Sequence, residues 1–191
     1  MAGEPHRDIQ PVFYYDLGSP ECYLVAEQIM AALPVVPEWE PVYAPTIGLP
    51  VAELDRDALV RRAAELELQP VRWPSRWPPD TREAMLAATY AKRVGRAVAF
   101  SLAAFRQEFA GGRDLGERDS VLIAAAAAEM HPTAMLKGIA LRSVTDALAQ
   151  ACARAATAGV SALPAIELAG GVLEGERALE RAVALLAGAR A

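Results

Sequence analysis

The chain is predicted to be an α/β protein in which short strands near both ends frame a long helical block. Runs typical of strands occur at 11–15 and 39–43, and again after residue 164. The residues between these two groups form successive helical patterns broken by glycine and proline. With 191 residues, of which 53% are hydrophobic, the chain suits one domain or a small domain with a large insertion.

The first block predicts a strand followed by a helix. Residues 11–15 form a β-branched and aromatic run, which is typical of a strand. Ser19 then suits an N-cap, Pro20 a first helical position and Glu21 a first helical turn. Apolar residues recur at helical spacing from there to Leu33, so we expect one helix over this segment.

A second strand is expected at 39–43, after two prolines end the helix. Pro41 lies inside this run and cannot donate a hydrogen bond to a neighbouring strand. It therefore predicts an edge or bulge position. Together the two strands and their helix are expected to form a right-handed βαβ unit.

The middle of the chain is predicted to contain only helices, because its apolar residues recur at helical rather than strand spacing. Many of the 41 alanines lie here, and alanine favours helices. A loop at 69–79 is rich in proline and tryptophan, and it either lines a substrate mouth or covers the core. The helices are expected at 52–68, 80–94, 96–109 and 119–129, from 131 onward, and at 143–159, where Ser143 is the expected cap.

The last block returns to strands and ends in a helix. Residues 165–168 alternate between the two faces of a strand, Gly170 and Gly171 predict a hairpin turn, and 172–174 is the returning strand. A terminal helix follows from Ala178. We therefore expect a four-stranded mixed sheet with helices on both faces. The expected domains are a sheet domain at 10–50 and 158–191, and an inserted helical domain at 51–157.

Composition excludes several classes of function. The net charge of −5 argues against nucleic-acid binding as the main activity. Two cysteines and two histidines exclude a disulfide scaffold and a Cys/His zinc site, so no metal is expected. The longest apolar runs, 121–128 and 182–187, are shorter than a membrane span of about 20 residues. The first ten residues lack the apolar core of a signal peptide. We therefore expect a cytoplasmic protein without a membrane or nucleic-acid partner.

Three motifs bear on chemistry, and their order along the chain resembles one branch of the thioredoxin-fold superfamily. Residues 13–20, with Tyr23 and Leu24, are similar to the opening of DsbA-like proteins, kappa-class glutathione transferases and 2-hydroxychromene-2-carboxylate isomerases. In the last two groups a Ser-Pro-x-x opening stands where disulfide enzymes carry Cys-x-x-Cys. Residues 159–164 resemble the branch's Gly-Val-x-Gly-x-Pro, whose proline is cis, and 175–179 resemble its Gly-x-Asp-Arg-Leu. This resemblance covers about 12–186 and implies a thioredoxin-like fold with a large all-helical insertion.

The resemblance also implies a thiol site. Ser19, at a helix N-terminus, would donate a hydrogen bond to the thiolate of glutathione or another low-molecular-weight thiol. The helix dipole favours such an anion independently of any family. The resemblance further implies that Pro20, Leu163 and Pro164 contact the bound thiol. Two further residues, Glu176 and Arg177, would hold its γ-glutamyl end.

The sequence leaves two interpretations of Cys22 open. It would lie in the first helical turn, where the dipole favours a thiolate, but the adjacent Glu21 opposes one. Its N-terminal partner is replaced by Ser19, so dithiol–disulfide cycling is excluded at this motif. Cys22 is therefore either a monothiol nucleophile or an inert buried residue. The second cysteine, Cys152, lies among alanines and is expected in the core.

The chain departs from the branch at three places. Glu176 replaces an aspartate, Glu21 replaces an aromatic residue, and the short segment 42–50 lacks an asparagine that contacts glutathione in relatives. The site could therefore be remodelled, take another thiol or be inactive.

The predicted function is a thiol-dependent isomerase or transferase of the 2-hydroxychromene-2-carboxylate isomerase type, acting on a small electrophile. Two alternatives stay open: a thiol–disulfide oxidoreductase that uses Cys22, and a degenerate binding protein. The expected partners include a second copy of the chain, in a homodimer.

Overall fold

The computed structural model describes residues 10–49, 54–169 and 171–188. Its sheet has four strands in the order β2-β1-β3-β4. The second strand runs parallel to β1, and the other neighbouring pairs are antiparallel. This confirms the predicted mixed sheet. The strands are β1 (Val12–Tyr15), β2 (Glu38–Pro41), β3 (Ala165–Leu168) and β4 (Gly171–Glu174).

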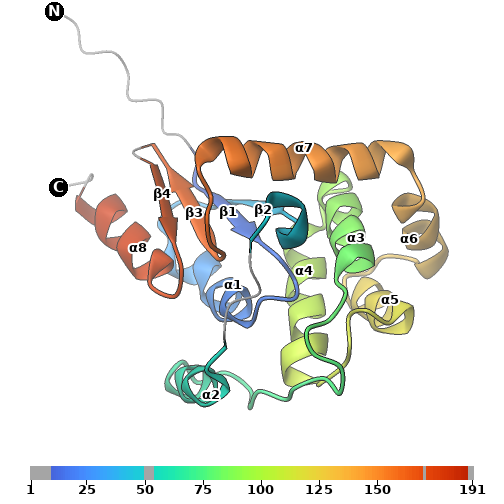
Figure 1. Ribbon diagram of the computed structural model, residues 1–191, viewed down its shortest axis with the longest axis horizontal. Helices are drawn as coiled ribbons and strands as arrows, with labels where there is room; N and C mark the ends of the chain where they lie inside the picture. The colour runs from blue at the N-terminus through green and yellow to red at the C-terminus, as the bar shows by residue number, and fades with distance from the viewer. Residues whose placement is uncertain (1–9, 50–53, 170, 189–191) are drawn as a thin grey trace, which may run out of the picture.

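Helices occupy most of the remaining described chain, and those within 82–139 gather on the β2 side of the sheet (Figure 1). Helix α1 (Pro20–Ala32) connects β1 to β2, and α8 (Ala178–Gly188) packs against β3 and β4. The intervening elements are η1 (Ala44–Ile47), α2 (Arg56–Glu65), α3 (Arg82–Arg93), α4 (Ala97–Phe105), η2 (Arg106–Ala110), α5 (Arg118–Ala127), α6 (Pro132–Ile139) and α7 (Arg142–Ala158).

One face of the sheet is apolar and buried. Phe13 and Tyr15 of β1 point to it, and both are fully buried. The Tyr15 ring lies 5.9 Å from Phe105 of α4, and its hydroxyl shares a 2.7 Å hydrogen bond with Ser101 of the same helix. Tyr23 of α1 reaches the same aromatic cluster. The core therefore joins the sheet, α1 and the helical block in one hydrophobic cluster.

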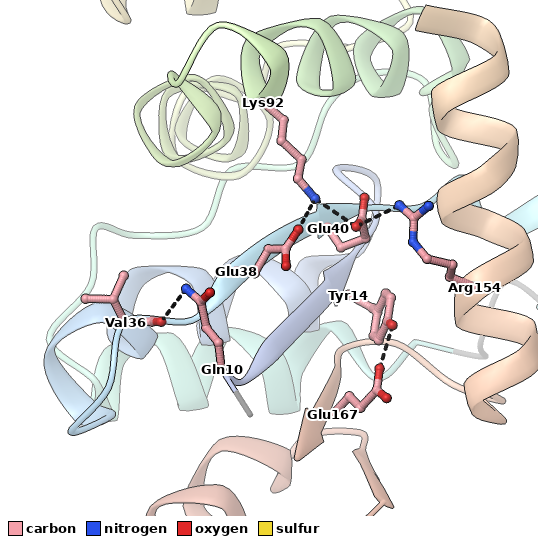
Figure 2. A network of polar contacts seen from close by, with 8 residues as sticks. All are labelled: Gln10, Tyr14, Val36, Glu38, Glu40, Lys92, Arg154 and Glu167. Carbon is pink, nitrogen blue, oxygen red and sulfur yellow. Dashed lines mark hydrogen bonds and ion pairs between the residues drawn. The ribbon is translucent and has the colours of Figure 1, made fainter. Parts of the chain in front are cut away.

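The opposite face carries a polar network that ties the helical block to the sheet edge (Figure 2). Glu40 of β2 accepts hydrogen bonds from Lys92 of α3 at 2.7 Å and from Arg154 of α7 at 3.0 Å. On the neighbouring strands Tyr14 donates to Glu167 at 2.6 Å. Because Glu40 is nearly buried, its two cationic partners offset the cost of removing its charge from water.

Several element boundaries differ from those predicted. Pro41 ends an edge strand, as expected, but β2 begins and ends earlier than 39–43. Ser143, the expected cap, lies inside α7, and the N-cap of this helix is Leu141. The Ser143 hydroxyl accepts a hydrogen bond from Arg93 instead. The helix expected at 96–109 divides into α4 and the π-helix η2. Residues 52–53 and Gly170 lie outside the described residues.

Within the described part of the chain, none of the helices is long and apolar enough to cross a membrane.

Candidate active site

The turn between β1 and α1 places Ser19 at the start of the helix. Its extended backbone, with φ −94° and ψ 116°, makes it the N-cap, and its hydroxyl oxygen accepts from the Cys22 N–H at 3.1 Å. Pro20 occupies the first helical position, as predicted. The Ser19 hydroxyl in turn donates to the Glu21 carboxylate at 3.1 Å. Ser19 thus has both the cap role and a donor hydrogen at the helix N-terminus.

A buried carboxylate fixes this turn. Asp16 accepts hydrogen bonds from the Gly18 N–H, the Ala44 N–H and the Thr81 hydroxyl, each at 2.9 Å. Burial raises the pKa of Asp16, and these three donors counteract the rise. Glycine at position 18 lets Thr81 lie close to this turn, because a Cβ there would lie 2.9 Å from the Thr81 side chain. Asp16 therefore connects the Ser19 turn to η1 and to the start of α3.

A cavity of about 210 Å³ opens beside Ser19. Most of its walls are apolar, and they come from the start of α1, η1, the loop before α3 and the segment before β3. Such a shape suits a small organic ligand with aromatic character. The lining residues are Asp16, Gly18, Ser19, Pro20, Glu21, Tyr43, Ala44, Pro45, Leu49, Leu54, Trp77, Pro78, Pro79, Thr81, Ser161, Ala162 and Leu163.

The segment before β3 brings Leu163 to the cavity. The Leu163–Pro164 peptide bond is cis, and Pro164 itself is buried and does not line the cavity. Glu174 of β4 holds this segment, because its carboxylate accepts from the N–H groups of Ser161 and Ala162 and from the Ser161 hydroxyl. Burial raises the pKa of Glu174, but the three hydrogen bonds outweigh it and leave the pKa below its usual value.

The Pro/Trp loop lines the cavity and also packs against the core. Trp77 lines the cavity, and its ring packs 5.1 Å from Trp73 and 6.1 Å from Phe109 of η2. The Trp77–Pro78 bond is also cis. The cation that stacks on this pair is Arg56 of α2, at 4.7 Å from the Trp73 ring.

Cys22 is fully buried and does not line the cavity. Burial raises the pKa of its thiol, and the charges of Glu21 and Asp16 add to the rise, while contacts to Ser19 and Asp16 counteract it. The thiol is thus held neutral and out of contact with solvent. Cys152 is buried on α7, as predicted, where its sulfur accepts from the Tyr43 N–H at 3.3 Å.

Glu176 and Arg177 lie at the start of the last helix but away from the main cavity. Both are exposed. Glu176 lines a separate, smaller hollow between α1, α2 and α8, whereas Arg177 lines neither. Glu21 lines both hollows. The structure therefore brings Ser19, Pro20 and Leu163 together around the main cavity. Glu176 lines only the smaller hollow, which shares Glu21 with the main cavity.

Sequence reasoning missed four contributors to this site. Asp16 carried a signal, since a carboxylate directly after a strand and before Gly-Ser is placed to accept turn N–H groups. Thr81 and Tyr43 carried none, because only the tertiary fold brings them to the cavity. Glu174 does not line the cavity and contributes only by holding the segment before β3. Among the described residues, no group of three or more histidine, cysteine or acidic side chains is placed to hold a metal ion.

Comparison with solved structures shows the fold. A 2-hydroxychromene-2-carboxylate isomerase superposes with a TM-score of 0.80 at 16% identity, covering 95% of this chain and 97% of that one. A probable DsbA oxidoreductase from Streptomyces coelicolor gives 0.75 at 20% identity, covering 95% and 89%. The cytosolic disulfide reductase DsbM from Pseudomonas aeruginosa, in a structure with GSH, gives 0.65 at 16% identity, covering 95% and 98%.

The curated proteins contain no match to this chain. Comparison with protein families, by contrast, matches residues 12–187 to the DSBA-like thioredoxin domain. That range includes the whole sheet, the Ser19 turn, the cis-proline segment and the helical block. The chain therefore belongs to the DsbA-like thioredoxin family.

Proposed function

We propose that the protein is a thiol-dependent enzyme in which Ser19 stabilises the thiolate of a bound low-molecular-weight thiol. The reaction would be an isomerisation or transfer of the 2-hydroxychromene-2-carboxylate isomerase type. The observation that carries this proposal is the position of the Ser19 hydroxyl, which lies at the N-terminus of α1 and lines an apolar cavity. A helix N-terminus and a hydroxyl donor both favour an anionic sulfur there.

The residues present fit the sulfur end of a thiol. Ser19 would donate to the sulfur once its hydroxyl turns from Glu21, and Leu163, which lines the same cavity, would contact the thiol. Glutathione is the thiol that the resemblance implies, and DsbM has been solved with it. When bound, the thiol would supply a nucleophile that adds reversibly to an electrophilic carbon and leaves again after bond rotation.

The cavity would hold the electrophile against the same turn. Tyr43 and Trp77 offer aromatic walls to an aromatic-derived substrate, and Leu49 and Leu54 add aliphatic surface. Apolar walls exclude water, which strengthens every electrostatic interaction with the reacting atoms. Asp16 would hold the turn in place without reacting, because its oxygens already accept three hydrogen bonds.

A monothiol oxidoreductase that uses Cys22 has less support. Its sulfur is fully buried, does not line the cavity and has a raised pKa, whereas a reactive thiol is accessible and has a lowered one. A catalytically degenerate binding protein would retain the cavity but not the ionisation of a bound thiol. These differences separate the three functions experimentally.

The test is calorimetric titration of glutathione into the wild-type protein and the Ser19→Ala and Cys22→Ala variants. The proposal expects binding to the wild type, at least about tenfold weaker binding to Ser19→Ala, since a hydrogen bond to a charged group is lost, and unchanged binding to Cys22→Ala. Cysteamine and 3-mercaptopropionate serve as alternative thiols. Absence of binding by all three thiols would refute the proposal.

A further inference from the structure

The cavity beside Ser19 holds acidic side chains but no basic one among its described lining residues. Asp16 and Glu21 are the acids. The guanidinium of Arg56 stacks on the tryptophan pair but does not line the cavity. A ligand's carboxylate would therefore meet no cationic side chain there.

Glu21 lies at the junction of the two hollows. It is the second residue of α1, it is half-buried, and it lines both the main cavity and the smaller hollow. Its carboxylate accepts from the Ser19 hydroxyl at 3.1 Å. None of the ion pairs formed by described residues includes Glu21. Its negative charge is therefore not neutralised by an ion pair with any side chain in the described part of the chain.

The smaller hollow adds more negative than positive charge. Glu176 and Glu180 line it together with Glu21, and Arg62 is its one basic residue among those described. The Arg62 guanidinium already contacts two carboxylates, that of Glu65 at 3.3 Å and that of Glu180 at 2.5 Å. A molecule that extends from Ser19 past Glu21 thus moves from one acidic environment into another.

We infer that Glu21 is a specificity-determining residue that selects a thiol carrying an ammonium group over a thiol carrying a carboxylate. This inference rests on the proposed function, because a sulfur held at Ser19 places the other end of a small thiol near Glu21. The N-terminus of α1 offers the sulfur about half a positive charge. A second negative charge on the ligand finds no partner, whereas an ammonium pairs with the Glu21 carboxylate.

Two matched thiols test this selection. Cysteamine carries an ammonium and 3-mercaptopropionate a carboxylate, each a short chain away from the sulfur. Calorimetric titration at low ionic strength keeps the electrostatic difference measurable. We expect cysteamine to bind the wild type about tenfold more tightly, and Glu21→Gln to reduce the ratio to about twofold. Asp57→Asn is the control, since it removes one negative charge from the second residue of another helix, α2, at an exposed position that lines neither hollow.

Benzylamine and benzoate repeat the comparison without sulfur. The inference is overturned if 3-mercaptopropionate binds as tightly as cysteamine, or if the preference persists in Glu21→Gln. In either case Ser19-dependent binding of both thiols leaves the proposed function intact. If neither thiol nor glutathione binds, the proposed function fails. The ratio of the affinities for benzylamine and benzoate then tests the charge selection by itself. An affinity ratio near one in the wild type overturns the inference.

Discussion

The hydroxyl of Ser19 donates to the carboxylate of Glu21 at 3.1 Å, and its oxygen accepts from the Cys22 N–H. One side chain therefore serves two separable purposes. The hydroxyl oxygen caps α1 by accepting a hydrogen bond. The hydroxyl group can also rotate, so that it donates its hydrogen bond to a bound thiolate instead of to Glu21. Substitutions that keep one of these roles and remove the other distinguish a structural cap from a catalytic residue.

Replacing Ser19 by aspartate keeps the cap and removes the donor. Aspartate is as good an N-cap as serine, whereas alanine loses about 1 kcal/mol of stability. We expect Ser19→Asp to unfold at nearly the wild-type denaturant concentration and yet to bind thiols at least about tenfold more weakly. Ser19→Ala should be impaired in both stability and thiol binding. Chemical denaturation and thiol titration of the two variants check this, and thiol binding retained in Ser19→Asp would assign Ser19 a cap role alone.

Cys22 is predicted to be inert in the folded protein. Both cysteines are free and buried, and burial raises the pKa of each thiol. An alkylating reagent should modify neither cysteine in the native state and both after unfolding. Mass spectrometry of the intact protein counts the modified thiols. Rapid native labelling of Cys22, together with lost activity in Cys22→Ala, would instead support the monothiol route.

Glu174 is predicted to stabilise the segment before β3 in a pH-dependent way. Burial opposes its charged form, but the hydrogen bonds from Ser161 and Ala162 leave its pKa below 4.5 in the folded protein. Its contribution is therefore complete above that pH and is lost as the pH falls through the folded pKa. Glu174→Gln should cost about 1 kcal/mol at pH 7, since half-exposed charged hydrogen bonds are screened.

The control for Glu174 is Glu176→Gln, which changes the charge of an exposed residue two positions later. Thermal unfolding of the wild type and both variants at pH 7 and near pH 3 measures the effect. The gap between wild type and Glu174→Gln should narrow in acid, while Glu176→Gln should follow the wild type throughout. A gap that stays constant with pH would show that the carboxylate charge is not what holds the segment.

Glu108 has the opposite pH dependence. It is fully buried in η2, where one carboxylate oxygen accepts from the Leu115 N–H at 2.7 Å and the other has no hydrogen-bond partner among the residues that the structure describes. Burial raises its pKa to about 8, with a further rise from Asp114 and a counteracting effect of the Leu115 hydrogen bond. Stability should therefore fall as the pH rises between the unfolded pKa of 4.5 and about 8.

Replacing Glu108 by glutamine removes the ionisation and keeps an acceptor for Leu115. We expect the variant to be more stable than the wild type by about 2 kcal/mol at pH 8, because no charge has to be buried, and to differ little at pH 5. Urea denaturation at the two pH values measures the difference. A variant that is less stable at pH 8 would mean that the charged form of Glu108 is well solvated.

The sequence predicted the sheet and the start of α1 because both depend on local signals. The β-branched and aromatic run at 12–15 and the Ser19–Pro20 cap each specify their element without distant contacts. The edge position of Pro41 followed from its missing N–H. By contrast, the π-helix η2 has no local signature, since its Phe109 packs on Tyr23 of α1 and on Trp73 and Trp77 of the Pro/Trp loop.

The site was predicted only in part for the same reason. Ser19 and Leu163 carry family motifs, and both line the cavity. Glu176 and Arg177 carried a motif as well, but a motif fixes a position in the chain and not its distance from the cavity. The hydrogen bond between Asp16 and Thr81 spans 65 residues, so no pattern in either segment could reveal it.

The central claim is that Ser19 holds a bound thiol in its ionised form. Ultraviolet absorbance of the thiolate, followed against pH with cysteamine bound to the protein, measures this ionisation directly. In the wild type the bound thiol should ionise at least about one pH unit lower than free cysteamine, and Ser19→Ala and Ser19→Asp should abolish the shift. A bound thiol that ionises at the same pH as the free one would contradict the account.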